Sequence, residues 1–197
     1  MRTIQLTLYK FNELSEDAQD NAVEAQQFIN LHDGWHEHIY EKHRMLAVNA
    51  GFGVHKQYHS GFWSQGDGAM FTYNDLSQKL LKEAVQKLTI SDEQKELLST
   101  AYLSGHCKHS GHYYHEYSAD HRISIEQDSF EHSEELQGLI DDYHHFLENL
   151  ILLQYAVLCQ NMYEDLTETY YELTSRKAVI EAIEANDLEF YEDGCEA

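Results

Sequence analysis

The chain has 197 residues, of which 42% are hydrophobic and 12% aromatic, and 35 acidic against 13 basic residues give it a formal net charge of −22. This charge excludes a surface that attracts nucleic acid or an anionic membrane, and it favours basic partners. The aromatic content argues against intrinsic disorder, and the length suits one domain.

The cysteines and the apolar segments indicate where the protein works. Cys107, Cys159 and Cys195 are far apart and form no CxxC pair, which is typical of a reducing compartment. The N-terminal residues do not resemble a secretion signal, and the longest apolar run, near 150–158, is too short to span a bilayer. We therefore expect a cytoplasmic protein that does not bind membranes.

The first 50 residues predict one strand and two helices. Alternating apolar and polar residues predict a strand over 3–11. Ser15 is placed to cap a helix that runs to about Asn30, and Asp33 is placed to cap a second helix that runs to about Ala50.

A β-hairpin is predicted next. Val54–Phe62 and Ala69–Tyr73 have the composition of strands, and the Gly-Asp-Gly sequence at 66–68 predicts a turn with positive φ angles. Ser91 is placed to cap a helix. Two helices and two strands follow, expected over 75–88, 92–104, 109–117 and 121–127.

A short sequence recurs later in the chain. HSGFW at 59–63 is echoed by HSGHY at 109–113. Each copy follows a predicted pair of helices and precedes a short strand. The echo predicts two β-(αα)-β-like units that share one antiparallel sheet.

The C-terminal third predicts one long helix and carries most of the charge. Apolar residues near heptad spacing predict a helix from Ser133 to about Thr174, followed by a helix over 176–185 and an edge strand over 188–191. Residues 126–197 contain 19 acidic and two basic residues. The expected fold is α+β in a single domain, 1–197: a small antiparallel sheet with helical hairpins over 1–127, and the long helix with an acidic tail over 128–197.

The acidic residues of the long helix are the first candidate site. They are interpreted either as the solvated side of an amphipathic helix or as a surface that binds a basic protein. The candidate partner-binding residues are Glu134, Glu135, Asp141, Asp142, Glu148, Glu164, Asp165 and Glu168.

The glycine-rich turn is the second candidate site. Gln65 and Asp67 would supply polar contacts, Gly66 and Gly68 would permit close approach, and the aromatic rings of Trp63 and Phe71 would stack on a base or a small ring. The alternative is a tight hairpin whose aromatic residues pack in the core.

Histidines near the second echo are the third candidate. Zinc requires three or four converging nitrogen or sulfur ligands. The weak candidates are His106, Cys107, His109, His112 and His115. On a strand these side chains would alternate between faces, so we expect no bound metal and no cofactor.

Three segments carry a resemblance to a known family. Residues 9–18 (YKFNELSEDA), 60–69 (SGFWSQGDGA) and 190–194 (FYEDG) resemble the opening, central block and ending of an uncharacterised group of phage and prophage proteins. Some members of that group are labelled as the antitoxin of a toxin–antitoxin stability system. The resemblance implies a mobile-element origin, a bacterial host cytosol and an inhibitory role.

Three functions follow as hypotheses, and no catalytic motif supports an enzyme. The first is an acidic inhibitor, acting in part by nucleic-acid mimicry, of a basic host protein such as a nuclease, toxin or defence-system component. It would not itself bind nucleic acid, and a homodimer is left open. The second is a small-ligand or nucleotide-binding module at Trp63–Gly68. The third is a zinc protein that uses the histidines of 106–121.

Overall fold

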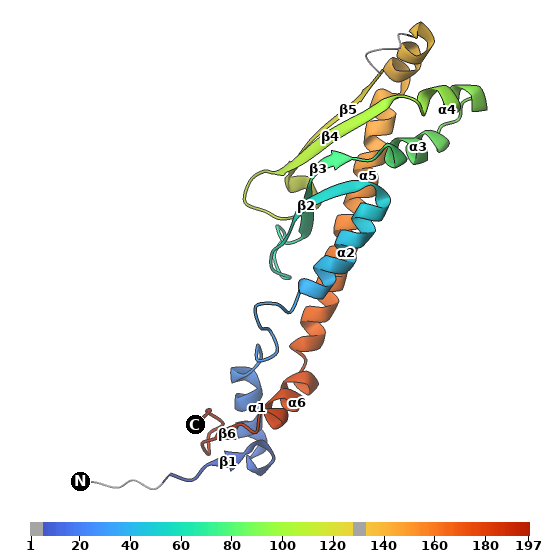
Figure 1. Cartoon of the computed structure of the whole chain (residues 1–197). Coiled ribbons are helices and arrows are strands. Elements are labelled where there is room, and N and C mark those ends of the chain that lie inside the picture. The colour runs from blue at the N-terminus through green and yellow to red at the C-terminus, as the bar shows by residue number, and fades with distance from the viewer. Residues whose placement is uncertain (1–5, 128–132) are drawn as a thin grey trace. The chain divides into compact units, whose positions relative to one another are not determined.

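The computed structural model of the protein describes residues 6–127 and 133–197. The chain divides into two compact units: unit 1 contains residues 1–37 and 166–197, and unit 2 contains residues 38–165. The elements of each unit are drawn in Figure 1. The α+β fold class is confirmed. The single folding domain stays a prediction, because compact packing units need not fold independently.

Unit 2 is built on a four-stranded antiparallel sheet. Its strands, in spatial order, are β2 (Phe52–His59), β3 (Ala69–Leu76), β4 (Tyr102–His109) and β5 (Ala119–Glu126). The predicted central hairpin is confirmed as β2 and β3. The strand predicted over 109–117 is wrong, because β4 ends where that prediction begins. Along β4 the buried Leu103 and Cys107 alternate with more exposed polar neighbours, so the alternation that defines the strand comes earlier in the chain.

The two hairpins of this sheet repeat one another. The strands β4 and β5 have the same lengths and the same spacing as β2 and β3, and the pairs next to the loops are His59↔Ala69 and His109↔Ala119. Residues 60–68 (loop A) and 110–118 (loop B) connect the strands, and each loop is closed by one equivalent hydrogen bond. The Ser60 amide donates to the Gly68 carbonyl at 3.0 Å, and the Ser110 amide donates to the Ser118 carbonyl at 2.8 Å. The helices are not repeated in this way, so the repeat is a hairpin rather than a β-(αα)-β unit.

Helices cover one face of this sheet. Those of unit 2 are α2 (Glu37–Ala50), α3 (Gln78–Gln86), α4 (Asp92–Leu98) and most of α5 (Glu134–Leu173), with a 3-10 turn η2 (Glu116–Ser118) in loop B. Figure 1 shows α2 beside α5. The Tyr155 hydroxyl of α5 donates to the Phe71 carbonyl of β3 at 2.9 Å, and both rings lie in the core. Ser91 caps α4 as predicted, with Gln94 completing a capping box.

The long helix matches its predicted bounds, and only part of its apolar surface packs against the sheet. The residues fully buried against the sheet include Leu147, Ile151 and Tyr155. In contrast, the apolar residues Phe146, Leu153 and Val157 are 51%, 61% and 50% exposed. The helix is apolar on more than one face, so the sequence alone does not identify the face that packs.

Unit 1 is assembled from the two ends of the chain. Its elements are β1 (Tyr9–Lys10), a 3-10 turn η1 (Phe11–Glu13), α1 (Glu16–Ala25), α6 (Arg176–Ala185) and β6 (Glu189–Phe190). The strands β1 and β6 pair through Tyr9↔Phe190 and Lys10↔Glu189. Phe190 is fully buried beside Phe11, with ring centroids 6.5 Å apart. Ser15 caps α1, and α6 has its predicted bounds.

Three N-terminal predictions need correction. In the described part of the predicted strand 3–11, only β1 is a strand, because β6 offers just two residues for pairing; residues 3–5 lie outside the described residues. The first helix ends at Ala25 rather than Asn30, whose side-chain amide instead donates to the carbonyls of Leu173 and Ala178. The second helix begins at Glu37, so Asp33 does not cap it.

The glycines that need positive φ are not those of the predicted turn. Among the described residues, the glycines with positive φ are Gly51, Gly111 and Gly194. Gly51 ends α2, as expected. Gly66 and Gly68 are required for space instead. A Cβ at Gly68 would lie 2.6 Å from the Cβ of His115, and one at Gly66 would overlap the Tyr113 ring.

Candidate functional site

Loop A is a turn closed by its own aspartate. The Asp67 carboxylate accepts backbone hydrogen bonds from Trp63 at 2.8 Å and Ser64 at 2.7 Å, and the Asp67 amide donates to the Ser64 carbonyl at 3.0 Å. This is the local side-chain-to-backbone bonding that favours aspartate in turns. Asp67 therefore holds the loop in shape, and one of its carboxylate oxygens is already engaged.

Loop A is also fixed to α5. The Tyr163 hydroxyl donates to the Gly61 carbonyl at 3.2 Å, and the Phe62 ring stacks on the Tyr163 ring at 5.8 Å with an interplanar angle of 21°. The predicted stacking residue Phe71 lies elsewhere. It is 3% exposed and packs against Tyr155, 4.7 Å away, in the core. Phe71 cannot form a wall of a ligand site with Trp63.

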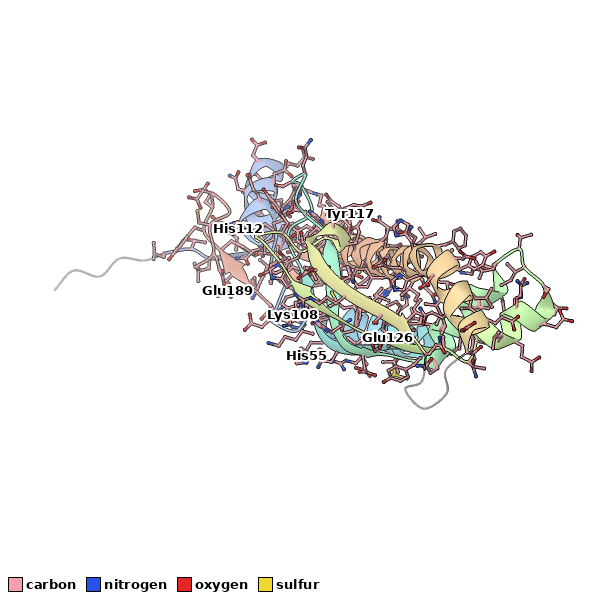
Figure 2. All side chains as sticks on the ribbon, turned by 90° about the horizontal axis from the view of Figure 1, so that it is seen from above. His55, Lys108, His112, Tyr117, Glu126 and Glu189 are labelled. Carbon is pink, nitrogen blue, oxygen red and sulfur yellow. The ribbon has the colours of Figure 1, made fainter. Side chains whose placement is uncertain are left out.

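The two hairpin loops meet at one end of the sheet and expose aromatic rings. Gly66 lies against Tyr113, and Gly68 lies against His115. The exposed fractions are 68% for Trp63, 57% for Tyr113 and 83% for Tyr117. Gln65 is also exposed. Figure 2 shows His112 and Tyr117 on loop B, at the opposite end of the β4–β5 hairpin from Glu126.

The candidate metal ligands lie on different faces of the sheet and in the loop. Cys107 is buried opposite His121, while His106 pairs with Arg122 on the other face. His109 Nε2 lies 3.0 Å from the Tyr113 carbonyl, and the His115 ring accepts the Tyr117 amide at 3.1 Å. Within residues 6–127 and 133–197, no three His, Cys, Asp or Glu side chains are grouped to hold a metal ion.

Several ionisable groups are buried in the core without forming a reactive site. The Tyr73 hydroxyl lies 3.0 Å from His121 Nδ1, and burial lowers the pKa of His121 while Asp120 opposes this. Burial raises the pKa of Cys107 to about 11 and that of Cys159 to about 12. Thiols with such pKa values stay protonated near neutral pH and are poor nucleophiles.

The acidic residues of α5 fall into two groups. Glu134, Glu135, Asp141 and Asp142 are exposed, and no basic side chain of the described residues pairs with them. Asp141 accepts a hydrogen bond from the side-chain amide of Gln137 at 2.8 Å. The remaining four candidates lie further along the helix. Glu148 lies 3.8 Å from His145, Glu164 accepts a hydrogen bond from Gln160 at 3.0 Å, and Glu168 is exposed on the part of α5 that belongs to unit 1.

Asp165 joins α5 to α2. Its carboxylate contacts Lys42 Nζ at 2.5 Å and His43 Nε2 at 2.6 Å, and the His43 side chain is only 4% exposed. Burial opposes ionisation of Asp165, but the hydrogen bonds from Lys42 and His43 lower its pKa below the usual value. Asp165 is therefore an internal ion-pair partner. Sequence reasoning missed this cluster because His43 and Asp165 are distant in the chain and meet only when α2 packs beside α5.

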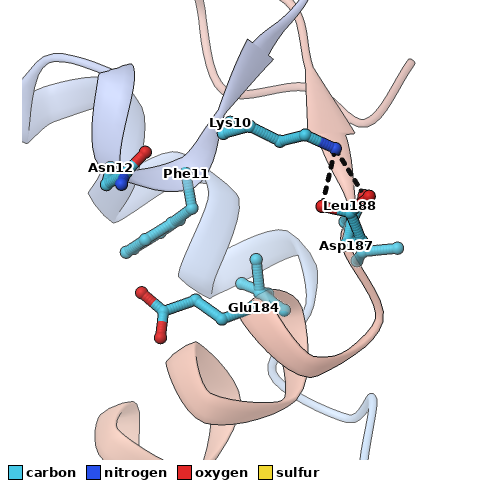
Figure 3. Close-up of a pocket in the computed structure, with 7 residues that line it drawn as sticks. Lys10, Phe11, Asn12, Glu184, Asp187 and Leu188 are labelled. Carbon is cyan, nitrogen blue, oxygen red and sulfur yellow. Dashed lines mark hydrogen bonds and ion pairs between the residues drawn. The ribbon is translucent and has the colours of Figure 1, made fainter.

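The negative charge is concentrated in unit 1. That unit contains 16 acidic and 4 basic residues, a net of −12, whereas the longer unit 2 contains 19 and 9, a net of −10. A pocket of about 230 Å³ in unit 1 is lined by Lys10, Phe11 and Asn12, by residues of α6, and by Asp187 and Leu188 in the segment that follows α6 (Figure 3). Lys10 is already neutralised there by Asp187 at 2.9 Å and Glu189 at 3.2 Å, so its charge is not available to a ligand.

None of the helices described here has a segment long and apolar enough to cross a membrane. Comparison with curated proteins and with solved structures gave no match. A family model described as a domain of unknown function, DUF8835, matches residues 35–176. This region contains all of unit 2, whereas most of unit 1 lies outside it. The chain belongs to the DUF8835 family.

Proposed function

We propose that this chain is a non-enzymatic phage or mobile-element protein that binds and blocks a basic host protein, such as a nuclease, a toxin or a defence-system component. The observation that carries the proposal is the group of exposed acids at the start of α5, Glu134, Glu135, Asp141 and Asp142, which lack basic partners among the described residues. The resemblance of residues 9–18, 60–69 and 190–194 to phage and prophage proteins supports the mobile-element origin.

The proposed role of these acids is to attract the partner. On an ordinary exposed helix, acidic residues alternate with lysine or arginine at i,i+4, which cancels the field. No Lys or Arg occurs between Arg122 and Arg176, so the field of α5 is not cancelled along the helix. Such a field raises association rates with basic proteins and weakens with added salt.

Nucleic-acid mimicry would be only approximate on this helix. The acid pairs 134–135 and 141–142 are one heptad apart, which is about 10.5 Å along a helix. DNA presents one charge per about 1.7 Å of its axis, or about six charges over the same distance. Close mimicry of DNA would therefore need further acidic residues. We expect the acids to steer the partner and neighbouring uncharged contacts to supply most of the affinity.

The test compares two neutralised proteins. In the first, Glu134, Glu135, Asp141 and Asp142 are changed to Gln or Asn. In the control, Glu83, Asp92, Glu93 and Glu96 of α3 and α4 are changed in the same way, which alters the net charge equally beside Lys79, Lys82 and Lys95. A partner captured from host lysate is purified, and its association rate with each protein is measured from low to high salt.

We expect the α5 variant to associate at least about tenfold more slowly at low salt and to show a flatter salt dependence, while the control stays near wild type. Equal association rates for all three proteins at every salt concentration would contradict the proposal.

A second candidate function is ring binding at the hairpin loops. It is favoured by the exposure of Trp63 (68%) on loop A and of Tyr113 (57%) and Tyr117 (83%) on loop B, since exposed aromatic faces can stack on a base or a sugar. The polar contact first assigned to Asp67 is weakened by its role in closing loop A. Tryptophan fluorescence of a Trp35→Phe protein, titrated with nucleotides, reports on Trp63 alone. An unchanged spectrum at millimolar nucleotide would exclude this function.

A further inference from the structure

The middle of α5 carries no charged residue. No Asp, Glu, Lys or Arg occurs from Asn149 to Tyr163, about four turns of helix, in a chain with 24% charged residues. The window lies within unit 2, and its exposed residues include Asn149, Gln160 and Asn161 as well as apolar side chains. A helix surface in water normally carries charges on its exposed side, so this window differs from a solvated face.

The window contains two apolar stripes. One packs into the core through residues such as Leu147, Ile151 and Tyr155. The second follows the 4-3-4 spacing of a coiled-coil seam and consists of Phe146, Leu150, Leu153 and Val157. In this second stripe (the outer seam), Phe146, Leu153 and Val157 are 51%, 61% and 50% exposed, while Leu150 is partly buried against the core.

An uncovered seam of this kind is unfavourable in water. Burial of a Leu, Val or Phe side chain is favourable, so three half-exposed side chains in a row leave much of that stabilisation unused. Monomeric proteins rarely present contiguous apolar patches of this type, and partner surfaces commonly do. The seam spacing matches an approaching helix.

The residues beside the seam identify the partner. Positions that flank a coiled-coil seam usually carry charges that select a partner of opposite sign. Here the flanking residues are neutral and include Asn149, Gln154, Ala156 and Asn161. Within residues 149–163, a partner chosen for its positive charge would find no carboxylate beside the seam, and the nearest flanking one is Asp142, one turn before Phe146. A second copy of the chain also has a net charge of −22, so it can approach only where both surfaces are uncharged. The amide side chains beside the seam both donate and accept hydrogen bonds, so those of one copy complement those of the other.

We propose that the outer seam pairs antiparallel with the same seam of a second copy of this chain. With a twofold axis midway between Leu150 and Leu153, Leu150 of one copy lies against Leu153 of the other. Phe146 then lies against the partner's Val157. The same axis sets Asp142 against the partner's Asn161 and keeps the acid pairs 134–135 and 141–142 of one helix away from those of the other, while Glu135 meets the partner's Glu168. A parallel arrangement would bring Asp141 and Asp142 of both copies together, which like-charge repulsion disfavours.

The first test measures mass. Sedimentation velocity of the full-length protein is compared with a Leu153→Glu/Val157→Glu variant and with Tyr102→Glu, a control that places a charge at an equally exposed aromatic site on β4. Circular dichroism checks that all three are folded. We expect wild type and Tyr102→Glu to be dimers at micromolar concentration, and the dimer Kd of the double variant to rise at least about 100-fold. A wild-type monomer at all concentrations, or a double variant that remains dimeric, would overturn the proposal.

The second test measures the orientation. Cys107 and Cys159 are buried and Cys195 is exposed, so a Cys195→Ser background leaves an introduced Asp141→Cys as the accessible thiol among the described residues. Spin labels at this site are expected about 31 Å apart along the axis in the antiparallel dimer, from about 1.5 Å per residue on either side of the twofold axis. A separation of about 10 Å, the usual distance between packed helices, would mean a parallel pair and would contradict the proposed geometry.

Discussion

Unit 2 and unit 1 of this chain are held together in different ways. Unit 2 is formed by one continuous segment with a four-stranded sheet and a large core centred on Phe71, Tyr73 and Tyr155. Unit 1 joins the two chain ends through paired strands of two residues each and a much smaller cluster of buried side chains. Unit 1 also has the higher density of negative charge. The comparison teaches that the family domain can rely on its own apolar core, whereas unit 1 depends on a few long-range contacts that oppose electrostatic repulsion.

The largest expected effect is the loss of the unit 2 core. Tyr155→Ala removes a ring that contacts Phe52, Phe71 and Tyr73, together with its hydrogen bond to the Phe71 carbonyl. We expect about 3–5 kcal/mol of destabilisation, measured by urea unfolding. The control is Tyr171→Ala on the same helix, whose side chain is 51% exposed and should cost less than about 0.5 kcal/mol. Similar losses in the two proteins would show that the core is placed incorrectly.

A smaller effect should be confined to unit 1. In Gly194→Ala the new Cβ overlaps the Ala18 carbonyl oxygen, and φ at this position is 89°. We expect about 2–4 kcal/mol of local destabilisation, seen as faster hydrogen exchange in α1 and α6 with protection of the sheet unchanged. Gly111→Ala is the matched control, since its φ is 88° and no atom lies within 4 Å of its Cβ; it should cost about 1–2 kcal/mol. An equal acceleration of exchange in both units would mean that they do not open separately.

A pH titration should separate the core of unit 2 from its surface. Burial holds the pKa of His121 below its ordinary value, so the unfolded chain binds the proton more readily. The resulting stability is present above the unfolded pKa of about 6.5 and is lost as the pH falls below that value towards the lower pKa of the folded protein. The free energy of unfolding of His121→Gln should fall less than that of wild type over this range. The slopes of the two curves against pH should differ by less than about 1.4 kcal/mol per pH unit. Parallel curves for the two proteins would contradict burial of this imidazole.

The smallest effect concerns the exposed acids of α5. Asp141→Asn/Asp142→Asn should raise helix stability by a few tenths of a kcal/mol, because it relieves repulsion between neighbouring carboxylates. Glu134→Gln/Glu135→Gln should lower it by a similar amount, because these residues lie in the first turn, where negative charge stabilises the helix dipole. Thermal unfolding of both variants at low salt measures the difference. Stabilisation by both pairs of changes would mean that repulsion dominates over the dipole even at the helix start.

Local sequence signals identified much of the fold. Ser15 and Ser91 were recognisable as caps because capping depends on residues three positions away, and α5 and α6 were recognisable from their apolar spacing. The displaced strand shows the limit of such signals. The histidine of each HSG sequence ends a strand, yet the histidine-rich stretch 109–117 also fits the pattern of a strand. Only the pairing with β5 shows that the strand is 102–109 and that 110–118 is a loop.

The candidate sites were harder to read than the elements. Asp67 is a residue type expected to contact a ligand, yet its hydrogen-bond partners are the backbone amides three and four residues before it. Asp165 belongs to the acidic stripe by sequence, whereas in the structure it forms an ion pair with Lys42 and a hydrogen bond with His43. Phe71 lies near Trp63 in sequence but in the core in space. In each case a specific contact in the folded chain decided the role, and sequence periodicity does not predict such contacts.

The repetition of the hairpin has a practical consequence. Loops A and B have the same length, join strands of equivalent register and are closed by equivalent hydrogen bonds from a serine amide to a carbonyl. The two loops nevertheless are not interchangeable, because Gly66 and Gly68 of loop A leave the space that Tyr113 and His115 of loop B occupy. A new sequence in one loop must therefore preserve its fit to the other, so a laboratory that diversifies these loops has to vary them together.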